Sequence, residues 1–227
     1  MTKKNNYQVE WRFEKDLIEY PQAIELMTQR VEKIINHQAS DLIWVLEHPP
    51  IYTAGVSAKD SDVLNADGVK IYQTNRGGKY TYHAPGMKII YVMMDLKKLF
   101  YPNKPDVASF VKFLENWIID LLSEYQIIGK IRENRVGIWV EKNPGNQTSD
   151  QKISAIGIKL KKWVSYHGIA INVDCDLSGF NRIIPCGIKE YGITSMEQLG
   201  CKTKDQFFNN EFEKNIEKKF YQNLKFI

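Results

Sequence analysis

The spacing of apolar residues changes along the chain, and each change marks an expected element. Apolar side chains recur at three- and four-residue steps over residues 20–40, which predicts an amphipathic helix. The positions that share this face are Ala23, Ile24, Met27, Val31, Ile34 and Ile35. Pro21 suits the first turn of such a helix, because its missing N–H costs nothing there. A second helix with a broad apolar face is expected over residues 105–127, and a charged third helix over residues 204–224.

Shorter apolar or alternating runs predict strands between these helices. They lie at residues 7–13, 41–49, 69–75, 87–96, 134–141, 152–162 and 163–174. Residues 51–68 are expected to be mostly loop, and residues 76–86 a glycine-rich connection. Strands outnumber helices, and neither a repeat nor a linker interrupts the pattern. The sequence therefore predicts one mixed α/β (α+β) domain over residues 1–227.

Composition narrows the class of protein. The 227 residues are 43% hydrophobic and 26% charged, as in ordinary globular proteins. No apolar run approaches the roughly 20 residues of a membrane span, and the first residues lack the apolar block of a signal peptide. We therefore expect a cytoplasmic protein that binds no membrane. The net charge of +4 favours acidic partners but falls short of the clustered basic stripe of a nucleic-acid binder.

Three cysteines, Cys175, Cys186 and Cys201, stand at irregular spacing. An odd, irregular set argues against a disulfide framework, and the absence of paired Cys/His motifs argues against zinc. Cys186 differs from the others because it lies between a proline and a glycine, where the backbone turns and a side chain becomes exposed. Cys175, flanked by two acids, and Cys201 fit a packing role better.

A nucleophilic Cys186 would need a partner. A free thiol has a pKa of about 8.5, so a nearby cation or base must lower it. Lys152, His83 and His167 are the candidates, and the sequence alone does not choose among them.

Three stretches combine small residues with polar groups. In "RGGKYTYHAPG", residues 76–86, the glycines let the backbone approach a ligand, although a simple hairpin or bulge would also need them. "KISAIGIK", residues 152–159, follows its lysine with a small apolar turn, and a solvated lysine at a strand start is the alternative. "WVSYHGIAINV", residues 163–173, predicts either a functional site or a β-bulge with a core histidine whose hydrogen bonds are made within the protein.

Together these stretches resemble the lipoyl(octanoyl) transferase family. The matching segments keep the order and spacing of that family over about residues 44–196. They are "LEHPPIYTAG" (46–55), "RGGKYTYHAPG" (76–86), "YVMMDL" (91–96), "ENRVGIWV" (133–140), "KISAIGIKLKKWVSYHGIAINV" (152–173), "DLSGFNRIIPCGI" (176–188) and "ITSM" (193–196). The resemblance implies the catalytic-domain fold of biotin and lipoate protein ligases, a mixed sheet with packed helices and a ligand tunnel.

The resemblance also implies roles for individual residues. Cys186 matches the family's nucleophile, and Lys152 matches the lysine that lowers the pKa of that cysteine. The positions that match the three substrate-binding loops are Arg76, Gly77, Gly78, Lys79, Tyr80, Thr81, Tyr82, His83, Ala155, Ile156, Gly157, Gly168, Ile169 and Ala170. Ala84 replaces the family's usual glycine, and it would be strained if that position needs a positive φ.

The implied reaction moves an octanoyl group from acyl carrier protein to a lysine of lipoyl domains, in 2-oxoacid dehydrogenases and glycine cleavage H protein. A thioester donor is already activated, so no cofactor, ATP or metal is needed, and the enzyme is expected to be a monomer. The oxyanion donors are expected among backbone N–H groups near Lys152, or at His83. Two alternatives stay open: an ATP-dependent lipoate or biotin ligase, and a non-catalytic module that binds carrier protein or nucleic acid.

Overall fold

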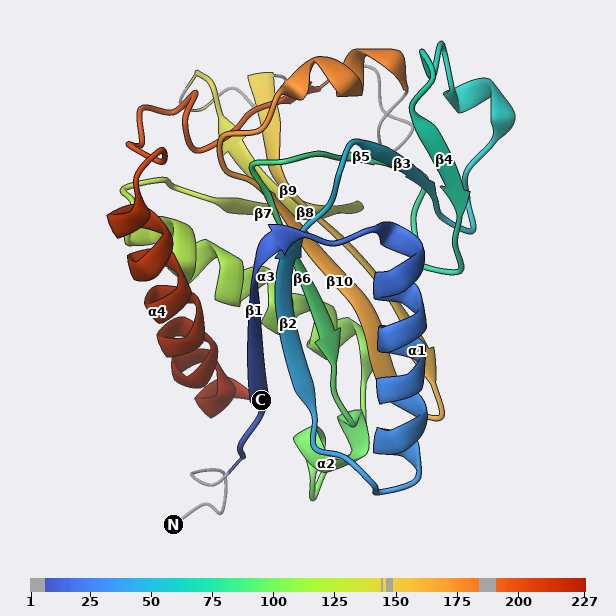
Figure 1. Ribbon diagram of the computed structural model, residues 1–227. Helices are drawn as coiled ribbons and strands as arrows, with labels where there is room; N and C mark the ends of the chain where they lie inside the picture. The colour runs from blue at the N-terminus through green and yellow to red at the C-terminus, as the bar shows by residue number, and fades with distance from the viewer. Residues whose placement is uncertain (1–6, 144, 146–148, 184–190) are drawn as a thin grey trace.

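The computed structural model describes residues 7–143, 145, 149–183 and 191–227. Its main sheet has the order β1-β2-β6-β10-β9-β8-β7, with β11 added beside β9 (Figure 1). These strands are β1 (Glu10–Leu17), β2 (Leu42–Glu47), β6 (Met87–Met93), β7 (Lys130–Arg132), β8 (Arg135–Glu141), β9 (Asp150–Lys161), β10 (Val164–Asn172) and β11 (Gly192–Ile193). β1 runs parallel to β2, and β11 runs parallel to β9, while the other pairs are antiparallel. The fold is therefore a mixed sheet of the α/β class, as the sequence predicts.

A smaller sheet of order β4-β3-β5 packs over one end of the main sheet (Figure 1). Its strands are β3 (Ile51–Ala54), β4 (Lys70–Gln73) and β5 (Tyr80–His83). The expectation of a mostly loop segment after residue 50 missed β3, whose Tyr52 is fully buried. A run of four apolar or small residues is too short to signal a strand by periodicity alone.

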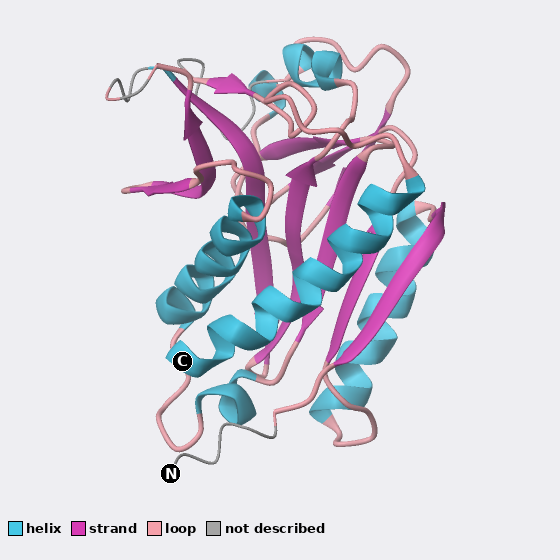
Figure 2. Ribbon diagram, turned by 90° about the vertical axis from the view of Figure 1, so that its left-hand side faces the viewer, coloured by secondary structure: helices cyan, strands magenta, loops and turns pink. Residues whose placement is uncertain are grey.

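Helices cover both faces of the main sheet (Figure 2). α1 (Tyr20–Ile35) packs on one face, and α3 (Val107–Ser123) and α4 (Gln206–Asn223) pack on the other; a short α2 (Leu96–Phe100) follows β6. The side-chain carboxylates of Asp106 and Asp205 cap α3 and α4 by accepting backbone N–H bonds. α1 ends earlier than expected, because His37 adopts a positive φ of 58°.

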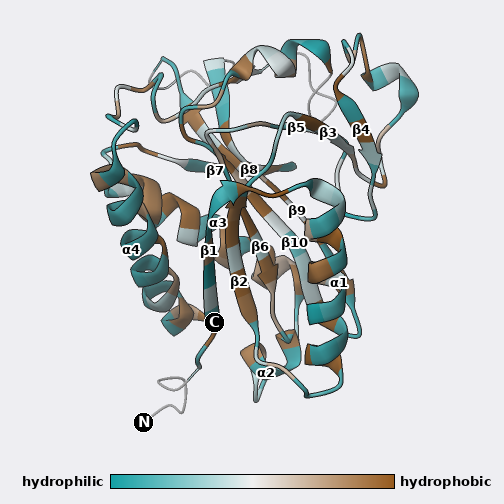
Figure 3. Ribbon diagram, viewed as in Figure 1, coloured by the Kyte–Doolittle hydropathy of each residue, from teal (hydrophilic) through white to brown (hydrophobic). Residues whose placement is uncertain are grey.

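The alternation of side chains in β2 and β6 divides the core into two layers. Ile43 and Val45 pack with α3 and α4, whereas Leu42, Trp44 and Leu46 pack with α1 and the small sheet. Figure 3 shows β2 and β6 as hydrophobic strands and the outer side of α4 as hydrophilic. In the part of the chain that the structure describes, no helix is long and apolar enough to cross a membrane.

Candidate functional site

A cavity of about 210 Å³ lies between the main sheet and the glycine-rich segment that precedes β5. Strands β9 and β10 supply part of its lining with Ala155, Ile156 and Gly157 and with Gly168, Ile169 and Ala170. Gly157 pairs with Gly168, so neither strand places a side chain there. Along β9 the cavity lining runs from Lys152 to Gly157, roughly 16 Å at about 3.3 Å per residue.

Thirteen of the fourteen predicted binding residues line this cavity, together with Lys152. The exception is Tyr82, which points into the core and packs against Tyr52 and Phe180 at centroid distances of 5.2 and 5.7 Å. β5 alternates its side chains between two faces, with Thr81 and His83 on one and Tyr80 and Tyr82 on the other. Tyr80, at the start of the strand, still contributes to the lining, whereas Tyr82 does not. Cys186 lies outside the described residues.

Lys152 is buried, with only 5% of its surface exposed, so the alternative of a solvated lysine is wrong. Its Nζ donates a hydrogen bond to the Val136 carbonyl at 3.0 Å and lies 4.7 Å from the centre of the Trp139 ring. Residues 154–157 continue strand β9 and form no turn, contrary to the expectation. Lys152 therefore projects from a strand into the cavity wall.

The chain on both sides of residues 184–190 lies near this lysine. Ile193 pairs with Lys152 across β11 and β9, and Thr194 N–H donates to the Lys152 carbonyl at 3.0 Å. A second, small cavity shares Lys152 with the first, and Phe180 and Ile193 help to line it. The segment that contains Cys186 thus joins two anchored ends, of which the second is bonded to the Lys152 backbone.

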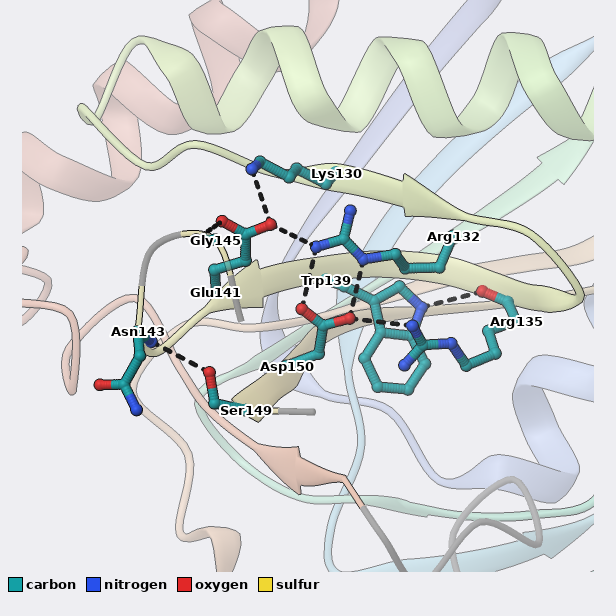
Figure 4. Close-up of polar contacts among 9 residues, drawn as sticks. All are labelled: Lys130, Arg132, Arg135, Trp139, Glu141, Asn143, Gly145, Ser149 and Asp150. Atoms are coloured by element: carbon teal, nitrogen blue, oxygen red, sulfur yellow. Dashed lines mark hydrogen bonds and ion pairs between the residues drawn. The ribbon is translucent and has the colours of Figure 1, made fainter. Parts of the chain in front are cut away.

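A charge cluster around the buried Asp150 joins strands β7, β8 and β9 (Figure 4). Asp150, two residues before Lys152, accepts bonds of 2.7 and 2.9 Å from Arg132 and one of 2.9 Å from Arg135. The hydrogen bond from Arg132 is the main cause that lowers the pKa of Asp150. Glu141 bonds Arg132 and Lys130 at 2.6 and 2.8 Å.

Arg135 links this cluster to two aromatic rings. Its guanidinium carbon lies 4.8 Å from the Trp139 ring centre and 4.0 Å from that of Tyr191, the first described residue after 190. No role was expected for Arg135, Asp150 or Trp139. The available signals were that Arg135 and Trp139 lie in the family-matching segment at residues 133–140, and that Asp150 stands two residues before Lys152 on the same strand.

Arg76 folds the glycine-rich segment onto β3. Its guanidinium donates to the carbonyls of Thr53, Gly77 and Lys79 at 2.6, 2.9 and 2.8 Å. Gly77 N–H donates to the Ile158 carbonyl at 3.0 Å, which closes the segment over β9. At Gly157, an added Cβ would come within 3.0 Å of the Gly77 carbonyl, so this close approach depends on glycine.

Three buried histidines lie near the cavity, and His83 and His167 line it. Burial lowers the pKa of His48 to about 4, that of His167 to about 3, and that of His83 well below its ordinary value. Neutral imidazoles supply no positive charge to a thiolate, so among the three candidate partners of Cys186 the charge argument favours Lys152.

His167 is held by Asn75, with a ring nitrogen 2.9 Å from the amide oxygen. β9 and β10 pair around it without a register shift, so the bulge in that alternative is wrong, although the histidine is buried and hydrogen-bonded as the alternative held. A φ of 60° marks the position. Within the described residues, the buried Nδ1 of His83 has no hydrogen-bond partner. Nη1 of Arg135, which also lines the cavity, is likewise buried without a hydrogen-bond partner among the described residues.

The other cysteines fit the packing role that the sequence predicts. Burial, aided by Asp174 and Asp176, raises the pKa of Cys175 to about 12, and burial also raises the pKa of Cys201. Among the described residues, no group of three or more His, Cys, Asp or Glu side chains is placed to hold a metal ion.

Comparisons with known proteins agree with this architecture. The model of the lipoyl protein ligase A/B catalytic domain matches residues 19–221. An octanoyltransferase of Wolbachia pipientis wMel is 46% identical over 213 residues, which are 94% of this chain and 98% of that protein. An octanoyltransferase of Brucella suis is 48% identical over 197 residues, 85% of this chain and 72% of that protein.

A solved structure shows the same fold at low sequence identity. The bipartite lipoate protein ligase of Thermoplasma acidophilum superimposes with a TM-score of 0.68 at 14% identity, over 96% of this chain and 85% of that one. The chain belongs to the lipoyl protein ligase A/B catalytic-domain family and, within it, to the octanoyltransferases, which are acyltransferases.

Proposed function

We propose that this protein transfers an octanoyl group from octanoyl-acyl carrier protein, through a thioester on Cys186, to a lysine of lipoyl domains. The observation that carries the proposal is a buried lysine side chain on the wall of a largely apolar cavity, beside the anchored end of the Cys186 segment. An ammonium in that position favours a thiolate nearby. The relatives named octanoyltransferase supply the identity of the acyl group.

In the first step, the Cys186 thiolate attacks the thioester carbonyl of the donor. The bond from carbonyl carbon to donor sulfur breaks, and the departing thiolate takes a proton from the Lys152 ammonium. Octanoyl-Cys186, a donor thiol and a neutral Lys152 amine remain. Exchange of one thioester for another needs no added energy source.

In the second step, the amine of the acceptor lysine attacks the octanoyl-Cys186 carbonyl. Neutral Lys152 takes the proton from the attacking nitrogen, and the Cys186 thiolate leaves. The amide product is more stable than a thioester, and the ammonium–thiolate pair is restored. Lys152 therefore gives a proton in one step and accepts one in the other.

The cavity supports a choice of acyl chain by length. Apolar and small residues of β9 and β10 line it, and each methylene buried there is worth about 0.8 kcal/mol. A chain that is two carbons shorter would lose roughly twice that amount. In this proposal the enzyme works as a monomer in the cytoplasm, the compartment that also contains its carrier-protein donor and its lipoyl-domain acceptors.

The test is the mass of the intact protein after mixing with octanoyl-acyl carrier protein, without ATP. Wild type should gain one octanoyl group that hydroxylamine releases, and Cys186→Ser should gain none. Lys152→Ala should acylate at least about 100-fold more slowly, the usual contribution of a general acid–base.

Cys201→Ser is the matched thiol control and should acylate as wild type does. An acyl group retained in Cys186→Ser would contradict the proposal. So would turnover that needs free acid and ATP, which would identify a ligase.

A further inference from the structure

Glu115 is a buried carboxylate that the proposed reaction does not use. It lies on α3 and is 6% exposed. Its Oε1 accepts a hydrogen bond from Gly137 N–H at 3.1 Å. Burial is the main cause that raises the pKa of Glu115, whereas the Gly137 bond, Lys152 and Lys112 lower it. A carboxylate is costly to bury, so its position on an otherwise apolar face needs a reason.

The peptide unit between Val136 and Gly137 connects this carboxylate to Lys152. The carbonyl of that unit accepts the hydrogen bond from Lys152 Nζ at 3.0 Å, and its N–H donates to Glu115. In a trans peptide the C=O and N–H point in opposite directions. The negative end of the peptide dipole thus faces the ammonium and the positive end faces the carboxylate, so each bond strengthens the other.

The backbone at Gly137 is shaped for this connection. Its φ is +114°, and the pairing of β8 with β9 shifts register between Ile138 and Trp139. An added Cβ would lie 2.5 Å from the Ser154 carbonyl and 3.4 Å from Lys152 Nζ. An irregularity of this kind re-aims a strand's groups, and here it turns one peptide between two charged side chains.

We propose that Glu115 is a positioning residue for Lys152, acting through the Val136–Gly137 peptide. It fixes the carbonyl that holds the ammonium, and its negative charge makes that carbonyl a stronger acceptor. The inference rests on the proposed function of Lys152. Glu115 itself touches neither substrate nor the reacting atoms.

Glu115→Gln tests the charge, because the amide oxygen can still accept the Gly137 N–H. We expect kcat for octanoyl transfer to fall about tenfold, the difference between a charged and a neutral hydrogen bond, with KM unchanged. Alkylation of Cys186 by iodoacetamide should slow by a similar factor. Wild-type kcat in a folded Glu115→Gln protein would overturn the inference.

A double-variant cycle separates this role from a general effect on folding. In the Lys152→Ala background, Glu115→Gln should leave the alkylation rate of Cys186 unchanged, because its effect passes through Lys152. An equal drop in both backgrounds would overturn the inference. If instead Lys152→Ala transfers octanoyl at the wild-type rate, the proposed function itself fails.

Two further variants complete the design. Asp41→Asn is the matched control: Asp41 is also buried and accepts a backbone N–H, from Asp95 at 3.1 Å, but its partners Tyr7 and Asp95 lie away from the Val136–Gly137 peptide in the chain. Its kcat should equal that of wild type.

Glu115→Asp replaces Glu115→Gln as the test if that variant yields too little folded protein. It keeps the charge but withdraws the carboxylate from Gly137 N–H by the length of one methylene. The same loss of kcat is expected there, and wild-type kcat would contradict the proposal.

Discussion

At the scale of single residues, Arg76 shows how a cation near a substrate cavity can serve the backbone. Its guanidinium binds three carbonyls and the Thr53 hydroxyl, which no single-point cation could do. The family resemblance placed Arg76 in a substrate-binding loop. The described contacts show a group that also holds the glycine-rich segment in place.

Arg76→Lys should therefore disturb the cavity although it keeps the positive charge, because an ammonium cannot reach all the acceptors of the guanidinium. We expect a KM for octanoyl-acyl carrier protein raised about tenfold and a free energy of unfolding lower by about 1–3 kcal/mol, because carbonyls lose their donors. Steady-state kinetics and denaturant unfolding measure both. Arg12→Lys, at an exposed arginine, is the matched control, and equal effects at the two sites would contradict this role for Arg76.

Ala84 is a second case at this scale. The resemblance raised the concern that alanine replaces a glycine with a positive φ. Ala84 does not have a positive φ, whereas the nearby Gly86 does, at 80°. An added Cβ at Gly86 would meet the Asp174 side chain at 2.5 Å, so the strict requirement for glycine lies two residues later.

At the scale of elements, β9 carries both the proposed catalytic lysine and the carboxylate that anchors its neighbours. Asp150 starts this strand with a fully buried side chain and binds arginines from β7 and β8. Removing one partner of a buried ion cluster leaves charges without compensation. The edge of the sheet beside Lys152 therefore depends on this one carboxylate.

Asp150→Asn should lower the free energy of unfolding by about 3–5 kcal/mol at neutral pH. The folded pKa of Asp150 is depressed, so its contribution is present above the unfolded value of about 3.9 and is lost as pH falls through the folded pKa. The variant should accordingly lose less stability than wild type below about pH 4. Urea unfolding at several pH values measures this.

The matched control is Asp67→Asn, which removes an exposed partner of Arg182. An exposed pair contributes at most about 1 kcal/mol. Equal losses at Asp150 and Asp67 would show that burial of the cluster does not matter.

At the scale of the whole molecule, three of the four histidines are buried around the junction of the two sheets. Their folded pKa values are depressed, to about 4 for His48, about 3 for His167 and well below the ordinary value for His83. Below about pH 6.5, the pKa of histidine in the unfolded chain, these side chains are protonated in the unfolded state but stay neutral in the folded state. Folding therefore becomes less favourable as pH falls.

The free energy of unfolding should decline from about pH 6.5 downward, by about 1.4 kcal/mol per pH unit for each such histidine. Measurements between about pH 7.5 and 5.5 avoid the titration of unfolded carboxyl groups. His167→Gln should reduce the slope of the free energy of unfolding against pH by the contribution of one histidine, about 1.4 kcal/mol per pH unit. His37→Gln, at an exposed position, should not change it, and a flat wild-type profile would contradict the expectation.

Much of the fold could be predicted from the sequence because its signals are local. Helices α1, α3 and α4 each carry a stripe of apolar residues, and the capping aspartates of α3 and α4 lie near the expected starts. β2, β6, β8, β9 and β10 are apolar or alternating runs of six or more residues. β3, β5, β7 and β11 were missed, because strands of two to four residues depend on their neighbours and carry little periodicity. β4 also has four residues, and it was found within the longer run expected at residues 69–75.

The sequence by itself determined a mixed α/β domain and the glycine-rich segments, and the family resemblance added the pairing of Lys152 with Cys186 as a hypothesis. Only the tertiary structure decided which side chains share the cavity, that Tyr82 turns away from it, and that Lys152 is buried. It also showed the peptide between Lys152 and Glu115, which lie 37 positions apart in the chain. Periodicity reports the burial of a face, whereas contacts between distant residues depend on strand register and helix packing, which no local pattern encodes.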